Sequence, residues 1–180
     1  MSTPGPDAVQ VAFEGPLFRV EVQTWGDRRR DVVRHPGACG AVVLIEGDRV
    51  LLVRQLREAV GQALLEIPAG IYDVEGEAPA DAIRREIAEE TGHRVTRLDP
   101  LGSIFTSPGF TDERIDLFLC DARPGADPLE HGIEVVAMAL DRAVRMALEG
   151  SLQDAKTVVA LLLARERLAS GGDQAGGSPP

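Results

Sequence analysis

The 180-residue chain lacks the long apolar run that a membrane-spanning helix requires. No stretch approaches the roughly 18 consecutive apolar residues that cross a bilayer, and residues 1–10 lack the basic and then apolar layout of a signal peptide. Cysteine is scarce as well: Cys39 and Cys120 lie in strand-like runs, where buried free thiols are expected. We therefore predict a cytoplasmic protein without a membrane partner, because free thiols persist in a reducing compartment.

A surplus of positive charge is also missing. The chain carries 19 lysine and arginine residues against 29 aspartate and glutamate residues, which gives a formal net charge of −10. A nucleic-acid surface needs a basic stripe, so we expect no nucleic-acid partner. Anionic small molecules stay possible, because bound divalent metal ions reverse the local electrostatic field.

Internal repeats and linkers long enough to divide the chain are absent too. With 44% hydrophobic residues the chain can bury one full-sized core. The ends, residues 1–10 and 169–180, are rich in proline, glycine and polar residues and are predicted to be disordered tails. Residues 11–168 are then a single domain.

Hydrophobic periodicity and turn signals predict alternating strands and helices. Strands are expected within residues 13–25 and 28–34, and at 39–45, 49–54, 64–67, 94–105, 115–120 and 133–140. Helices are expected at 79–91, at 141–150 with Asp141 as N-cap, and from a capping box at Ser151 to about Leu168. This order predicts an α/β layered domain, with helices around a mixed sheet.

The most informative segment is an acidic helix, Pro79–Thr91, which is followed by Gly92 at the position of a left-handed stop. Glu86, Glu89 and Glu90 are spaced i, i+3, i+4, so their carboxylates share one helical face. Like charges this close repel one another unless cations lie between them. Hard oxygen ligands at this spacing suit Mg²⁺. A solvated acidic helix is the alternative interpretation.

This segment resembles the signature box of the Nudix hydrolases, Gly-x5-Glu-x7-Arg-Glu-U-x-Glu-Glu-x-Gly-U, where U is aliphatic. The positions that match are Glu77, Arg85, Glu86, Ile87, Glu89, Glu90 and Gly92. Two positions depart from the pattern: Gly70 lies seven residues before Glu77 in place of six, and His93 replaces an aliphatic residue. The longer spacing falls in the loop before the helix, where length changes are tolerated.

The resemblance implies a Nudix-type α/β/α sandwich with a mixed sheet and an additional N-terminal antiparallel strand region. It also implies Mg²⁺, with Mn²⁺ as an alternative, held by Glu86, Glu89, Glu90 and the Ala69 carbonyl. Arg85 is expected to pair with Glu89 at i+4 and to orient the carboxylates.

Further segments resemble the ADP-ribose pyrophosphatase subfamily: residues 53–57, 66–70, 107–113 and 154–157. Pro108 lies sixteen residues beyond Gly92, a spacing that marks this subfamily. The resemblance covers residues 13–168 and implies Mg²⁺-dependent hydrolysis of ADP-ribose to AMP and ribose 5-phosphate. The alternatives are a sugar nucleotide such as GDP-mannose, a nucleoside triphosphate, and a domain that binds ADP-ribose without cleaving it.

Candidate substrate-binding residues come from the same segments. Arg54 and Arg57 can fork onto phosphate oxygens, or are surface arginines paired with Glu21 or Glu58. Glu66 holds ribose or adenine donors, or else caps its loop. The loop residues Ser107, Pro108 and Gly109, together with Glu113, complete the set.

The general base is the least determined part. The resemblance places it on a glutamate-bearing loop before the strand that starts near Ile133. Glu130 is the first choice and Glu134 the second. The resemblance also implies a homodimer in which N-terminal strands exchange and both subunits build the pocket, and the edge-like character of residues 13–34 is compatible with this.

Overall fold

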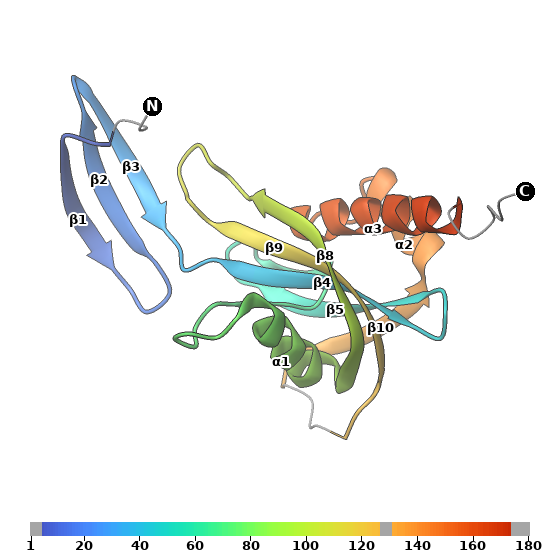
Figure 1. The fold of residues 1–180 in the computed structure, drawn as a ribbon. Coiled ribbons are helices and arrows are strands. Elements are labelled where there is room, and N and C mark those ends of the chain that lie inside the picture. The colour runs from blue at the N-terminus through green and yellow to red at the C-terminus, as the bar shows by residue number, and fades with distance from the viewer. Residues whose placement is uncertain (1–4, 127–130, 174–180) are drawn as a thin grey trace, which may run out of the picture.

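The strands that the described residues form lie in two separate sheets (Figure 1). The structure, a computed structural model, describes residues 5–126 and 131–173. The strands are β1 (Ala8–Glu14), β2 (Arg19–Trp25), β3 (Arg28–Arg34), β4 (Ala38–Ile45), β5 (Arg49–Arg57), β6 (Gln62–Glu66), β7 (Ala69–Ile71), β8 (His93–Phe105), β9 (Arg114–Pro124) and β10 (Glu134–Ala139). The helices are α1 (Pro79–Thr91), α2 (Leu140–Leu148) and α3 (Ala155–Asp173).

The larger sheet is mixed, as predicted. Its order is β10-β5-β4-β9-β8, with β6 beside β5 and β7 beside β4. Strands β4 and β9 run parallel, and the other neighbours in this sheet are antiparallel.

Helices cover both faces of this sheet because β4 is apolar on both sides. Cys39, Ala41 and Val43 pack into a cluster with Ile83 and Ile87 of α1. The alternate residues of the strand, Val42 and Leu44 among them, pack into a second cluster with side chains of α2 and α3. Successive strand residues point to opposite faces, so β4 lies between two cores. The predicted α/β/α sandwich is confirmed.

Helix α1 has the bounds that its sequence predicts. Pro79 opens it, and Ile83 and Ile87 are fully buried. Gly92 ends it with φ +67°, and its N–H donates to the Ala88 carbonyl at 3.0 Å. The apolar stripe packs on the sheet and Glu90 is buried beside it, whereas Glu86 and Glu89 are more exposed, so α1 presents its carboxylates along one border of the sheet.

The N-terminal sheet, β1-β2-β3, stands apart from the main body (Figure 1). It is joined to the loop before β9 by backbone bonds, Val33 N–H to the Phe110 carbonyl at 2.8 Å and Asp112 N–H to the Val33 carbonyl at 3.2 Å. The additional antiparallel region is therefore confirmed. Its first strand begins at Ala8, so residues 8–10 form a strand where a disordered tail was predicted.

The two C-terminal helices start differently from the sequence prediction. The N-cap position of α2 is Ala139, and Asp141 lies in its first turn. The cap of α3 is Asp154, whose Oδ2 accepts the Thr157 N–H at 2.9 Å. The capping box at Ser151 was wrong, because the Ser151 hydroxyl donates to the Met146 carbonyl at 3.0 Å. Helix α3 also continues to Asp173, past the predicted end.

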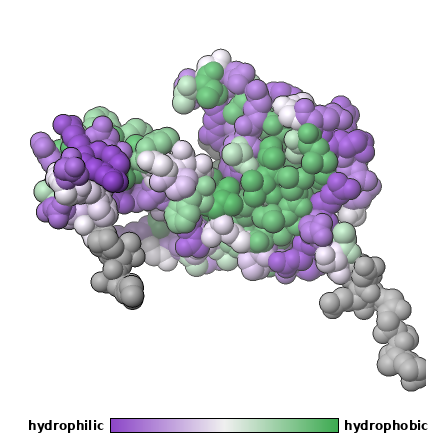
Figure 2. Space-filling view, turned by 90° about the horizontal axis from the view of Figure 1, so that it is seen from above, coloured by the Kyte–Doolittle hydropathy of each residue, from purple (hydrophilic) through white to green (hydrophobic). Residues whose placement is uncertain are grey.

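Hydrophobic side chains are exposed on the side of the molecule where α3 lies. Figure 2 looks down on this side and shows a broad hydrophobic area over the body. The exposed leucines of α2 and α3 are Leu148, Leu162, Leu163 and Leu168. None of the helices within the described residues has the length and apolar character needed to cross a membrane.

Candidate active site

Two clefts share β7 and Arg57 as a common wall. The acidic cleft, of about 520 Å³, is lined by Gln55, Arg57, Ala69, Gly70, Ile71, Asp73, Arg85, Glu86, Glu89 and Glu90. The α3 cleft, of about 430 Å³, is lined by Leu17, His35, Ala38, Arg57, Ala69, Gly70, Ile71, Thr106, Glu113, Ile115, Asp154, Ala155 and Lys156. Both volumes fall in the range of small-molecule sites, about 300–1,000 Å³.

Helix α1 brings its three glutamates to the acidic cleft, as their spacing predicts. They differ in exposure: Glu90 is 4% exposed, whereas the Glu86 and Glu89 side chains are 12% and 52% exposed. Glu90 Oε2 accepts the Ala69 N–H at 3.1 Å. This bond ties α1 to β7 and sets Ala69 beside the carboxylates.

Arg85 lies among these carboxylates and pairs with several of them. Its guanidinium lies 2.7 Å from Glu86, 3.3 Å from Glu89 and 3.0 Å from Glu77. Asp73 is a fourth partner at 3.1 Å. The predicted i, i+4 pair with Glu89 is present, and it is one part of a larger ion-pair network. Arg85 therefore restrains the acidic face.

The carboxylates are not gathered around a common centre in this structure. Within residues 5–126 and 131–173, no three carboxylate, imidazole or thiolate side chains are placed to hold a metal ion. The reason is local, because Glu86 turns towards Arg85 and Glu90 towards the Ala69 N–H.

The donor set nonetheless fits a hard cation. Glycine at position 70 leaves room for Glu86: a Cβ there would lie 1.9 Å from the Glu86 Cδ. Burial raises the pKa of Glu86, an effect that Arg85 opposes and Glu89 reinforces. A cation between Glu86 and Glu89 would stabilise both charges. The residues suited to hold one are Glu86, Glu89 and Glu90.

Arg57 and Glu66 bind each other in a bidentate ion pair. Arg57 Nε donates to Glu66 Oε1 at 2.8 Å, and Arg57 Nη2 donates to Glu66 Oε2 at 2.7 Å. Glu66 is 1% exposed and also accepts a hydrogen bond from Lys156. Burial acts to raise the pKa of Glu66, but the bonds and charges of Arg57 and Lys156 outweigh burial and lower it.

This geometry corrects one sequence prediction, because the alternative partners suggested for Arg57, Glu21 and Glu58, are wrong: its carboxylate partner is Glu66. A direct contact of Glu66 with substrate stays a prediction, and in this structure both carboxylate oxygens of Glu66 are bonded to cationic side chains. Arg57, with 39% of its side chain exposed, is the member of the pair that faces the clefts.

Arg54 and Glu134 form a separate pair on the surface. They stand opposite each other on β5 and β10, 3.2 Å apart, with side chains 45% and 67% exposed. Neither residue belongs to the lining of the acidic or the α3 cleft described above. The structure thus separates Arg54 from Arg57. The other candidate base, Glu130, lies outside the described residues.

The loop before β9 contributes its two ends to the α3 cleft. Thr106 donates to Glu113 Oε2 at 2.6 Å, and His35 Nε2 lies 3.7 Å from Glu113 Oε1. Between them, the Ser107 carbonyl accepts the Phe110 and Thr111 N–H groups, which forms a turn. The residues that line the acidic cleft and the α3 cleft do not include Ser107, Pro108 or Gly109.

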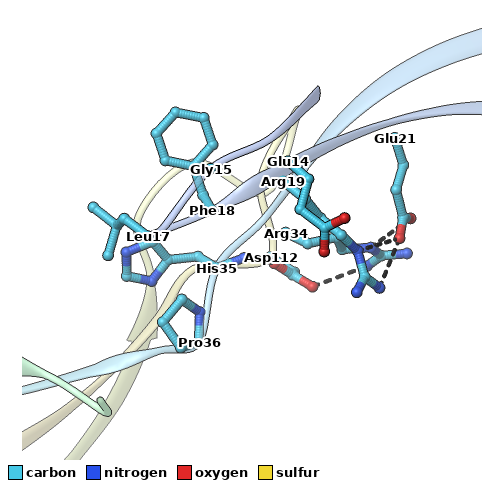
Figure 3. Close-up of a pocket in the computed structure, with 10 residues that line it drawn as sticks. All are labelled: Glu14, Gly15, Leu17, Phe18, Arg19, Glu21, Arg34, His35, Pro36 and Asp112. Atoms are coloured by element: carbon cyan, nitrogen blue, oxygen red, sulfur yellow. Dashed lines mark hydrogen bonds and ion pairs between the residues drawn. The ribbon is translucent and has the colours of Figure 1, made fainter. Parts of the chain in front are cut away.

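A third pocket, of about 520 Å³, lies at the junction between the N-terminal sheet and the body (Figure 3). Arg19 and Arg34 donate to the two oxygens of Glu21 at 2.9 and 2.8 Å. Arg34 also reaches Asp112 at 2.9 Å. These charges neutralise one another, and the ion pairs connect β2, β3 and the loop before β9.

Sequence reasoning assigned no role to His35, Thr106 or Lys156, which line the α3 cleft. The quartet 154–157 was noted only for its resemblance. No periodic pattern could reveal these residues, because His35 and Thr106 lie in loops and Lys156 in α3, far apart in the sequence.

The chain is similar to known proteins in both sequence and fold. A family model described as "NUDIX domain" matches residues 34–161. A methanol dehydrogenase activator of Bacillus methanolicus is 33% identical over 148 residues, which cover 79% of each chain. An ADP-ribose pyrophosphatase of Bacillus subtilis is 30% identical over 147 residues, 79% of each chain. A GDP-mannose pyrophosphatase of Cronobacter sakazakii is 34% identical over 151 residues, 73% of this chain and 78% of that one. A crystal structure of an ADP compounds hydrolase superposes with a TM-score of 0.79, at 22% identity, over 96% of this chain and 97% of that one.

Proposed function

The chain belongs to the Nudix hydrolase family, and from that premise we propose that it hydrolyses the diphosphate linkage of ADP-ribose to give AMP and ribose 5-phosphate. The observation that carries the proposal is the acidic cleft, in which Glu86, Glu89 and Glu90 face Arg57. A cleft with carboxylates on one wall and a guanidinium on another suits a diphosphate, whose oxygens bind metal ions and arginine together.

The site residues have separate roles in the proposed reaction. Glu86, Glu89, Glu90 and the Ala69 carbonyl would hold Mg²⁺, or Mn²⁺ in its place. Such an ion, once bound, supplies neutralisation of phosphate charge and a water of lowered pKa. Arg85 keeps the carboxylates in place, and Arg57 orients the diphosphate through two parallel N–H bonds. Glu130, or Glu134 as second choice, accepts the proton of the attacking water.

The experiment is an endpoint assay of nucleoside monophosphate release, with and without Mg²⁺. The panel contains ADP-ribose, GDP-mannose, diadenosine compounds and deoxynucleoside triphosphates. We expect AMP from ADP-ribose only when Mg²⁺ is present. Absence of cleavage of ADP-ribose beside rapid cleavage of another compound would overturn the proposal, and binding of ADP-ribose without cleavage would mark a non-catalytic domain.

A GDP-mannose pyrophosphatase activity is the second candidate. It is supported by the 34% identity to the protein of Cronobacter sakazakii. Both substrates carry a diphosphate between a nucleoside and a sugar, so the acidic cleft serves either one equally. Comparing kcat/KM for the two substrates separates the candidates.

The site is proposed to work in a homodimer. Strand β1 is exposed along its whole length, and Val9, Val11 and Phe13 are each at least half exposed. Apolar strands left uncovered favour association. Exchange of N-terminal strands would bring Leu17 and the α3 cleft next to the partner subunit. Two free, buried cysteines support a cytoplasmic location.

A further inference from the structure

Lys156 is the single lysine of the chain: of 19 lysine and arginine residues, all the others are arginines. It is the second residue of α3, and 10% of its side chain is exposed. A lysine ammonium is a compact point charge, whereas an arginine guanidinium is a wide planar fork. A chain that uses arginine for its other cationic side chains keeps lysine where it is almost fully enclosed.

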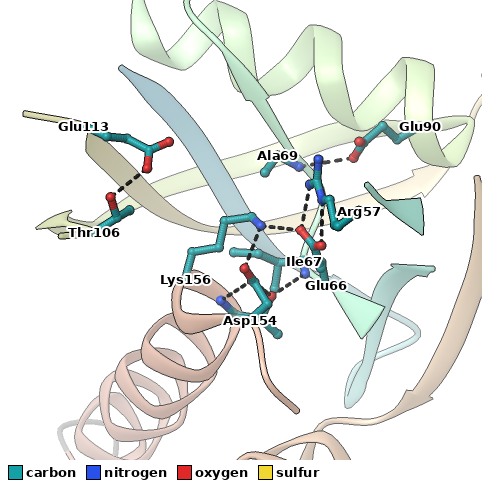
Figure 4. A network of polar contacts seen from close by, with 10 residues as sticks. Arg57, Glu66, Ile67, Ala69, Glu90, Thr106, Glu113, Asp154 and Lys156 are labelled. Carbon is teal, nitrogen blue, oxygen red and sulfur yellow. Dashed lines mark hydrogen bonds and ion pairs between the residues drawn. The ribbon is translucent and has the colours of Figure 1, made fainter. Parts of the chain in front are cut away.

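The ammonium of Lys156 joins two carboxylates (Figure 4). Its Nζ donates to Glu66 Oε2, and to Asp154 Oδ1 at 3.0 Å. Glu66 Oε2 also accepts the Nη2–H of Arg57, so one oxygen serves both cations. Asp154 in turn caps α3, which fixes the position of the lysine backbone.

Thr157, the residue after Lys156, binds the residue after Glu66. Thr157 is fully buried, and its hydroxyl oxygen accepts the Ile67 N–H at 2.8 Å. The first turn of α3 therefore grips Glu66 and Ile67 together, just before Ala69 of β7. Helix α3, although far along the chain, thus helps to position β7 and Arg57, which line both clefts.

We propose that Lys156 is a positioning residue of the substrate site: by sharing the Glu66 carboxylate with Arg57, it fixes the Arg57 guanidinium between the acidic cleft and the α3 cleft. The inference rests on the proposed function in that Arg57 is taken to bind the diphosphate. Lys156 acts through Glu66, so its loss should weaken substrate binding and leave the chemical step intact.

Charge alone can be separated from positioning by two substitutions of opposite sign. Lys156→Met removes a positive charge and Glu66→Gln removes a negative one. If only the local field mattered, an anionic substrate would bind more weakly to the first variant and more tightly to the second. If Arg57 must be held in place, both variants bind the anionic substrate more weakly.

The first measurement is KM and kcat of both variants, with the nucleoside diphosphate derivative that the wild type cleaves best. We expect KM to rise about tenfold or more in each variant, with kcat within about twofold, the signature of lost uniform binding. The matched control is Arg165→Met, which removes a positive charge from an exposed position of the same helix. An unchanged KM in Lys156→Met, or a lower KM in Glu66→Gln, overturns the proposal.

The second measurement restores the ammonium chemically. A Lys156→Cys variant treated with bromoethylamine regains a side chain of nearly the length and charge of lysine, while iodoacetamide gives a neutral one. The native thiols are protected, because burial raises the pKa of Cys39 and of Cys120 to about 12. We expect only the aminoethylated protein to recover the wild-type KM. Equal recovery with both reagents would refute the role of the charge.

Failure of the proposed function is distinguishable from failure of this inference. If the wild type cleaves nothing in the panel, the activity is refuted, and crystal structures of the wild type and Lys156→Met still decide the position of Arg57. A guanidinium found in the same place in both structures overturns the inference. A displaced guanidinium supports it.

Discussion

Gly70 gives the acidic cleft its shape at the scale of a single residue. We predict that Gly70→Ala lowers stability by about 1–3 kcal/mol, as overpacking of a close contact does. It should also abolish turnover, because the added methyl group would displace the Glu86 carboxylate. Urea denaturation and the AMP assay measure the two effects. Gly5→Ala is the control, since nothing lies within 4 Å of its Cβ position, and equal behaviour of the two variants would contradict the prediction.

Glu90 combines a structural bond with the proposed metal site. Glu90→Gln should abolish Mg²⁺-dependent turnover and leave the fold intact, because the Gln amide oxygen can still accept the Ala69 N–H. The measurements are AMP release and the thermal unfolding midpoint, with the exposed Glu75→Gln as control. Substantial remaining activity would remove Glu90 from the metal ligands.

The general base is tested by the same kind of substitution. Glu130→Gln should lower kcat by about a hundredfold or more, within the range for loss of a positioned base. Glu134→Gln should change kcat much less, because Glu134 pairs with Arg54 on the surface. Single-turnover kinetics at saturating Mg²⁺ make the comparison. An unchanged kcat in Glu130→Gln would shift the role to another residue.

At the scale of elements, the N-terminal sheet depends on one buried carboxylate. Hydrogen bonds from Arg34, then Gln23, lower the pKa of Glu21 to about 2, against the opposing effect of burial. Because the folded pKa lies below the ordinary value of 4.5, the stabilisation is fully present above pH 4.5. It is lost as the pH falls towards 2.

The single tryptophan reports on this sheet selectively, because Trp25 lies in β2 and donates to Gln23 at 3.0 Å. We predict that Trp25 fluorescence changes between pH 4.5 and pH 2, earlier than the far-UV circular dichroism of the whole chain. In Glu21→Gln the acid-dependent step should disappear. A step that persists unchanged in this variant would contradict the assignment.

Elements were predictable from the sequence where one local pattern decides them. Pro79, the spacing of Ile83 and Ile87, and Gly92 specify α1 without reference to the rest of the chain. Arg57 and Glu66 are different: each looks suited to a ligand when read alone, and their mutual pairing depends on β5 and β6 lying side by side. Asp154 and Ser151 are both good caps locally, so tertiary packing chose between them.

At the scale of the whole molecule, association through the N-terminal sheet should be measurable. Light scattering at micromolar concentration should give about twice the chain mass of 19.3 kDa. Val11→Lys should shift the protein towards monomer, because a charge on the exposed apolar face of β1 opposes its burial. Val60→Lys, at another exposed valine, should not. A wild-type monomer under these conditions would refute the dimer.

The parallel pairing of β4 with β9 has a consequence for how the protein is made. Ala38 lies opposite Ile115, so the sheet that supports α1 cannot close until residues far downstream have left the ribosome. Lys156 emerges later still. Chains stalled while β9 is still inside the ribosome should therefore be digested by protease within α1, and chains from which β9 has emerged should be protected; protection of the shorter chains would contradict this. The catalytic apparatus would then be among the last features of the molecule to mature during synthesis, although its signature lies near the middle of the chain.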